Sequence, residues 1–252
     1  TSPSFAIEQI TVRGADRLEE EEVRVAAGLE VGRNVFEHGP EQVRAALERH
    51  PWVARARVER RLPGAFTLEI EERHAVALLV LSPSAPDDAQ ERDGVATASE
   101  GPYLIGEDAT VFKRVEDGDP IDLPLLTGVD HDRFVADRAY RGSLLLEVVA
   151  LLHDYRAAGL WRREPISEIV LSETDETTLF VGEDAMQVRL GRGPHLEKLR
   201  KLRRVLDRLD AQDSRPVYVF LDNVRRPDRV VVRLREQPQP VVVAAAADGQ
   251  PS

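Results

Sequence analysis

Histidine is the side chain in this sequence best suited to metal binding or to acid–base catalysis near neutral pH, and six are present. A zinc site needs several ligands at short, fixed intervals along the chain, and no two of the histidines have such a spacing. The chain has no cysteine, which excludes a thiolate metal ligand, a thiol nucleophile and a disulfide. We therefore predict no metal site and no bound cofactor. The histidines are His38, His50, His74, His131, His153 and His195.

Motifs for nucleophilic catalysis and for phosphate binding are missing from the sequence as well. Neither a Gly-x-Ser-x-Gly elbow nor a Ser-x-x-Lys motif occurs. Gly191-Arg192-Gly193 precedes an expected helix, but it lacks the remaining glycine and the Lys-Ser/Thr pair of a phosphate loop, so a structural turn is the better interpretation. Acidic pairs such as Asp87-Asp88 lie in a predicted loop, and the sequence alone does not place them in a cleft. No catalytic residue is predicted, and we expect a protein that is not an enzyme.

The charge balance of the chain limits the kinds of partner that it can bind. The formal net charge is −11, whereas a nucleic-acid-binding protein needs a basic surface to neutralise phosphates, so we expect no nucleic acid partner. One expected helix, residues 195–210, is nevertheless basic, and it has a leucine stripe on one face. The stripe favours a helix that packs on a sheet with its charges in water. Contact of this helix with anionic lipid or with an acidic partner is the alternative.

Residues 5–74 have the pattern of a β-α-α-β-β unit. Its first helix is expected over residues 17–27, with Asp16 as the N-cap and Glu19 three residues later, as a capping box requires. Its last two strands are predicted from apolar side chains that alternate with polar ones. The expected elements are, in order, residues 5–12, 17–27, 40–49, 54–59 and 66–71.

The remainder of the chain predicts a mixed sheet with two amphipathic helices, so the expected fold class is α+β. Residues 82–102 are rich in Pro, Asp, Ser and Ala, which is typical of a loop. We predict one domain over residues 1–74, a second over 75–235, and a disordered tail over 236–252. The second domain is expected to have helices over residues 143–158 and 195–210, and strands over 75–81, 103–105, 110–113, 166–172, 177–181, 186–190, 217–221 and 229–235.

The last expected strand contains three consecutive valines between two arginines. The last strand of a chain can lie at the edge of a sheet, where its unpaired N–H and C=O groups accept a strand of another protein. A strand paired on both sides, or an edge protected by its arginines, is the alternative.

Short motifs occur in a characteristic order along the chain. In the first domain they include Pro51-Trp52-Val53 and Leu62-Pro63-Gly64. In the second they include Leu123-Pro124-Leu125-Leu126-Thr127-Gly128 and Val188-Arg189-Leu190-Gly191. The first set resembles a POTRA domain, which is a β-α-α-β-β module. Together, the motifs along residues 5–235 resemble the extracytoplasmic region of the FtsQ/DivIB family of bacterial cell-division proteins.

This resemblance implies a non-catalytic scaffold of the divisome at the periplasmic face of the inner membrane and at the division septum. A short cytoplasmic tail and one transmembrane helix would precede Thr1. The POTRA domain would help recruitment to the division site, and the C-terminal strand would pair with an FtsB-like protein in complex with an FtsL-like protein. The partner-binding residues that follow from the resemblance are Asn223, Arg225, Arg226, Arg229, Val230, Val231, Val232 and Arg233.

At two positions the sequence differs from the enterobacterial members of this family. Phe220 and Asp222 stand where Asp and Arg are familiar in enterobacterial members, which affects side-chain contacts more than backbone pairing.

The alternative function is that of a POTRA-bearing component of outer-membrane assembly or secretion. Such proteins usually carry several POTRA repeats and a barrel, whereas this sequence has one such unit and no barrel-length series of alternating strands.

Overall fold

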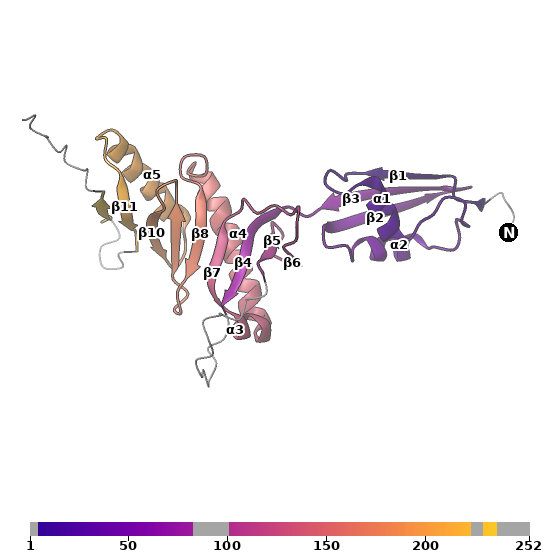
Figure 1. Ribbon diagram of the computed structural model, residues 1–252, viewed down its shortest axis with the longest axis horizontal. Helices are drawn as coiled ribbons and strands as arrows, with labels where there is room; N and C mark the ends of the chain where they lie inside the picture. Colours follow the sequence, from indigo (N-terminus) through magenta and orange to yellow (C-terminus); the bar gives the residue numbers. More distant parts are fainter. Residues whose placement is uncertain (1–4, 83–100, 223–228, 236–252) are drawn as a thin grey trace, which may run out of the picture.

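The computed structural model describes residues 5–82, 101–222 and 229–235, which form two units joined end to end (Figure 1). The N-terminal unit has a three-stranded sheet, and the C-terminal unit has a nine-stranded sheet. The expected α+β class, with a β-α-α-β-β unit followed by a mixed sheet with amphipathic helices, is confirmed.

The N-terminal unit buries one face of its sheet under its two helices. Strand order is β1-β3-β2, with β1 parallel and β2 antiparallel to β3. Side chains alternate between the two faces of a strand, and Phe66, Leu68 and Ile70 of β3 are all buried. Val43 and Leu47 of the second helix are buried as well, so helix and sheet share one core. The elements are β1 (Gln9–Arg13), α1 (Glu20–Ala27), α2 (Pro40–Leu47), β2 (Val53–Arg61) and β3 (Ala65–Glu72).

Helix α1 begins at Glu20 rather than at residue 17, so the expected N-cap at Asp16 is wrong. The backbone N–H groups of Arg17 and Leu18 donate to the carboxylate of Glu72 at the end of β3, over 2.9 and 2.8 Å. These N–H groups are thus held by a distant side chain, and the helix starts only after them.

The nine-stranded sheet has the order β12-β11-β10-β9-β8-β7-β4-β5-β6. Strand β7 was not predicted from the sequence, although it lies between β4 and β8 and is parallel to both. The expected hairpin of β5 and β6 is confirmed as an antiparallel pair. The strands are β4 (Ala75–Ser82), β5 (Tyr103–Gly106), β6 (Val111–Arg114), β7 (Leu125–Asp130), β8 (Ile166–Leu171), β9 (Thr177–Val181), β10 (Met186–Gly191), β11 (Pro216–Phe220) and β12 (Val231–Leu234).

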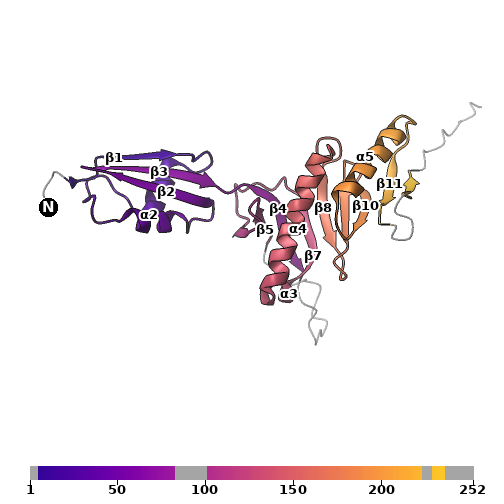
Figure 2. The ribbon, with the colours of Figure 1, turned by 180° about the vertical axis from the view of Figure 1, so that it is seen from behind.

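The long helices α4 (Arg138–Ala157) and α5 (Leu196–Asp210) lie on the same face of this sheet (Figure 2). The leucine stripe of α5 packs inward, as predicted, since Leu199, Leu202 and Leu206 are buried. Helix α4 starts five positions before the expected residue 143, and a short helix, α3 (His131–Ala136), precedes it. Among the described residues, no helix is both long and apolar enough to span a lipid bilayer.

Candidate partner-binding edge

Strand β12 lies at one edge of the nine-stranded sheet and pairs with β11 in antiparallel fashion. None of the described strands pairs with its other side. The opposite edge of the sheet is β6, which lies next to the N-terminal unit, so β12 is at the far end of the molecule (Figure 1).

One hydrogen bond fixes which backbone groups of β12 face away from the sheet. The N–H of Arg235 donates to the carbonyl of the residue before β11 at 2.8 Å. Because N–H groups point alternately to the two sides of a strand, those of Val231 and Arg233 also point toward β11. The N–H and C=O groups of Val232 and Leu234 therefore face the free edge.

The register on β11 gives the same result independently. The N–H of Leu221 donates to a carbonyl of β10 at 3.0 Å, so the N–H groups of Tyr218 and Phe220 point the other way, toward β12. Their partners across the ladder are Arg233 and Val231. Among the described strands, none occupies the outward-facing backbone of β12.

The side chains in and directly before β12 also divide into two sets. Val230 and Val232 are partly buried against the core of the C-terminal unit. Val231 and Leu234 are 51% and 46% exposed, which leaves apolar surface on a strand whose edge is open. The guanidinium of Arg233 lies 5.8 Å from the centroid of the Tyr218 ring.

The structure locates five of the eight residues predicted to bind a partner. Arg229 and Val230 directly precede β12, and Val231, Val232 and Arg233 are within it. The other three, Asn223, Arg225 and Arg226, lie outside the described residues. Leu234 was not among the predicted residues, but it belongs to the site because its side chain is exposed and its N–H faces the free edge. The sequence of the strand alone does not indicate which N–H groups face outward.

Lys198 fixes the chain just after β11, at Asp222. Its ammonium donates to the carbonyls of Leu190 and Arg192 and to the carboxylate of Asp222, each at 2.7 Å. The lysine therefore stabilises the end of β11 and the segment after β10, and this basic residue of α5 has its charge neutralised within the fold.

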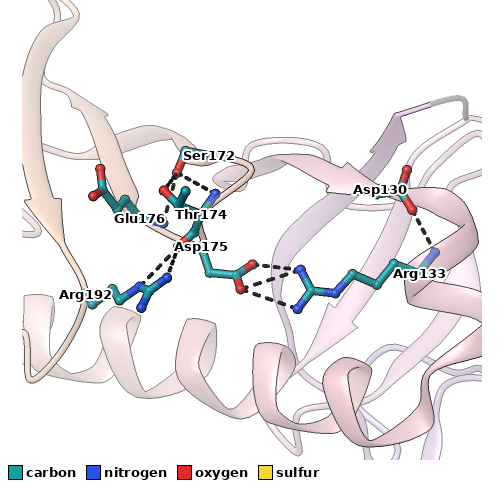
Figure 3. Close-up of polar contacts among 7 residues, drawn as sticks. All are labelled: Asp130, Arg133, Ser172, Thr174, Asp175, Glu176 and Arg192. Carbon is teal, nitrogen blue, oxygen red and sulfur yellow. Dashed lines mark hydrogen bonds and ion pairs between the residues drawn. The ribbon is translucent and has the colours of Figure 1, made fainter. Parts of the chain in front are cut away.

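Polar contacts at the same end of the sheet hold the turn between β8 and β9 in place (Figure 3). The guanidinium of Arg133 in α3 pairs with the carboxylate of Asp175 at 3.2 Å. Arg192, after β10, donates from Nε to the carbonyl of Thr174 at 3.1 Å. Within the turn, the Ser172 hydroxyl accepts from the backbone N–H of Thr174 at 3.3 Å. This turn is thus bound to elements on both sides, which gives this part of the nine-stranded sheet a fixed shape.

Two of the six histidines lie beside a carboxylate, the exposed His131 next to Asp132 and the buried His195 next to Glu147. The pKa of His195 is shifted. Its side chain is 5% exposed, and Nε2 lies 3.4 Å from a carboxylate oxygen of Glu147. Burial lowers the pKa of His195, against the opposing effect of Glu147, and its Nδ1 is buried with no hydrogen-bond partner. The imidazole packs between α4 and the start of α5. No group of three or more acidic or histidine side chains suited to a metal ion occurs in the described part of the chain.

Two family models match consecutive parts of the chain. Residues 5–73 match a model described as "POTRA domain, FtsQ-type", and residues 95–222 match one described as "Cell division protein FtsQ/DivIB, C-terminal".

Curated relatives match over nearly the whole chain. A "Cell division protein FtsQ" of Anaeromyxobacter sp. (strain K) is 35% identical over 92% of this chain and 73% of its own length. Another, of Myxococcus fulvus, is 31% identical over 93% of this chain and 75% of its own. A third, of Syntrophotalea carbinolica, is 26% identical over 92% of this chain and 75% of its own.

Proposed function

The chain belongs to the FtsQ/DivIB family of cell-division proteins, and we propose that it acts as a non-catalytic scaffold whose strand β12 accepts a strand of a partner. The partner is an FtsB-like division protein in complex with an FtsL-like one. In this proposal the N-terminal unit helps to recruit the protein to the division site. An N-terminal transmembrane helix would anchor it at the periplasmic face of the inner membrane.

The open edge of β12 is the observation that carries the proposal. An added strand would find the outward N–H and C=O groups of Val232 and Leu234, together with exposed apolar side chains on the same strand. The end of the strand is already held, because the guanidinium of Arg235 pairs with Asp184 at 2.9 Å. A pre-formed edge lowers the conformational entropy that a partner must lose on binding.

The same geometry identifies the substitution that tests strand pairing most directly. Proline has no backbone N–H, and it is tolerated on an edge strand where that group faces solvent. Leu234→Pro removes an outward donor, whereas Val231→Pro removes a donor to β11 and breaks the sheet itself. Loss of one backbone hydrogen bond, about 0.5–1.5 kcal/mol, weakens binding by about 2- to 10-fold.

We expect calorimetry to detect saturable binding of the extracytoplasmic segment of the same organism's FtsB-like protein. Leu234→Ala is the matched control, since it shortens the side chain and keeps the N–H. Leu234→Pro should bind more weakly than Leu234→Ala, with circular dichroism unchanged for both. Equal affinity of the two variants would contradict backbone pairing at this edge, and no binding by the folded unsubstituted chain would contradict the choice of partner.

The other candidate functions have less support. Both matching family models are of the FtsQ type, so no observation favours outer-membrane assembly or secretion. An enzyme would need a nucleophile and a base held together. The pair of buried His195 and half-exposed Glu147 has no serine or threonine bonded to it among the hydrogen bonds of the described residues. A screen with generic ester and glycoside substrates should therefore show no turnover.

A further inference from the structure

Asp119 is a buried carboxylate at the boundary between the two units. Its side chain is 4% exposed, and it accepts hydrogen bonds from Arg17 of the N-terminal unit at 3.0 Å and from Lys113 of β6. The backbone N–H of Glu116 donates to it as well, at 3.0 Å. Burial by itself would raise the pKa of Asp119, but these donors and the two cationic groups hold it below the usual range. A charged group with donors from both units thus lies inside the boundary.

Arg17 connects this carboxylate to the core of the N-terminal unit. Its guanidinium also donates to the carbonyl of Gly118 at 3.2 Å and lies 3.8 Å from the centroid of the Trp52 ring. Trp52 is 6% exposed, and its ring meets that of Phe112 in β6 edge-on, with centroids 5.1 Å apart. A continuous stack therefore runs from the N-terminal unit into the nine-stranded sheet.

Apolar side chains of the C-terminal unit extend the core of the N-terminal unit. Leu78 of β4 and Leu104 of β5 belong to the same buried cluster as the core of the N-terminal unit. Phe112, Val115 and Leu123 pack against that cluster from the C-terminal unit.

The chain passes between the two sheets through a very short segment. β3 ends at Glu72 and β4 begins at Ala75, so only Arg73 and His74 lie between them. The Arg73 side chain donates to the carbonyl of Pro51 at 2.8 Å and pairs with Asp108 at 3.3 Å, so this connection is braced from both sides.

We infer that the two units move as one rigid body, locked by a clasp that consists of Arg17, Trp52, Phe112, Lys113 and Asp119. Relative motion of domains is the ordinary expectation when their interface is small and polar. Here, bending would separate the buried carboxylate of Asp119 from the partly exposed guanidinium of Arg17, and it would expose Trp52 and Phe112 further to water. A rigid joint holds β12 at a fixed distance and angle from the N-terminal unit. This inference does not depend on the proposed function, because it concerns the free chain.

Distance measurements between spin labels test it directly, since the chain has no cysteine to compete for the label. Val25 in α1 is 72% exposed and Leu146 in α4 is 63% exposed, so Val25→Cys and Leu146→Cys place one label on each unit. A second pair, Leu146→Cys with Glu173→Cys, lies within the C-terminal unit. Its distribution of label-to-label distances gives the width that is expected when both labels are on one rigid body. We expect the pair across the joint to give one distance distribution as narrow as that of the second pair.

Substitutions in the clasp test whether its residues prevent motion between the two units. Arg17→Gln and Phe112→Ala should each broaden the distribution across the joint and leave the distribution within the C-terminal unit unchanged. Asp117→Asn is the matched control, because Asp117 is an exposed residue in the same loop, and it should have no effect. A broad or bimodal distribution in the otherwise unsubstituted chain would overturn the inference whether or not the variants fold. Narrow distributions in both clasp variants would show that these residues do not lock the joint.

Discussion

Trp52 fills the core of the N-terminal unit and contacts β6, so Trp52→Ala should destabilise the protein strongly. Truncation of a buried tryptophan lowers the free energy of unfolding by about 3–5 kcal/mol. Loss of the edge-on contact with Phe112 is about 0.5–1.5 kcal/mol of that total. The stacked guanidinium of Arg17 would lose its aromatic partner, a further effect of about 0.5–1 kcal/mol at a partly exposed site. We therefore expect a loss of about 4 kcal/mol, a large part of the 5–15 kcal/mol typical of a folded domain.

Urea denaturation followed by circular dichroism measures this loss. With a typical urea dependence of about 2–3 kcal/mol per M, the midpoint should fall by about 1–2 M. Trp52→Phe is the control, because it keeps an aromatic ring against Phe112 and should lose less than half as much. Trp161 remains as a fluorescent probe in the C-terminal unit, and a rigid joint predicts that its midpoint falls together with that of the dichroism. An unchanged midpoint in Trp52→Ala would refute the assignment of Trp52 to the core.

Other predictions concern single residues of the C-terminal unit. Burial lowers the pKa of His195 below its ordinary 6.5, so the unfolded state binds a proton more readily than the folded state. The free energy of unfolding should therefore decrease as the pH falls below about 6.5. This decrease should be smaller in His195→Phe. Equal pH dependence of the two proteins would contradict this. Gly128 has a φ of 75°, and an added Cβ would overlap the carbonyl of Leu171, so Gly128→Ala should cost more than about 2 kcal/mol. Gly142, within α4, has no such neighbour, so Gly142→Ala should raise the free energy of unfolding by about 0.5–1 kcal/mol. Thermal melts of the two glycine variants and of the unsubstituted chain measure both effects.

Secondary-structure elements with a clear hydrophobic periodicity were predicted correctly from the sequence. The alternation in β3 and the leucine stripe of α5 both identify faces that are buried in the structure. The missed strand β7 has no such period: it is six residues long, contains Gly128, and pairs with neighbours on both sides that are distant in sequence. The start of α1 was missed for a related reason, because its preceding N–H groups bind Glu72, fifty-five and fifty-four residues away.

The sequence predicted the strand of the candidate site, but not which of its backbone groups face outward. Three valines between two arginines are typical of a strand, and among the described strands β12 lies at an edge of the sheet. The direction of each N–H depends on the register with β11, and a bulge between Pro216 and Tyr218 shifts that register by one residue. No periodicity in the sequence of β12 reports such a shift.

The direction of these N–H groups decides how a result at this edge is to be interpreted. A proline at Val231 would abolish binding by undoing the β11–β12 ladder, and the same loss would follow if the partner bound anywhere near that ladder. A proline at Leu234 leaves the inward bonds of Val231 and Arg233 in place and removes one outward donor at the strand end. Weakened binding by Leu234→Pro, with the midpoint of unfolding unchanged, would thus report a bond between the backbones of the two proteins. A lowered midpoint in that variant would instead mean that the N–H of Leu234 is used within the sheet, and the register derived from Arg235 and Leu221 would be wrong.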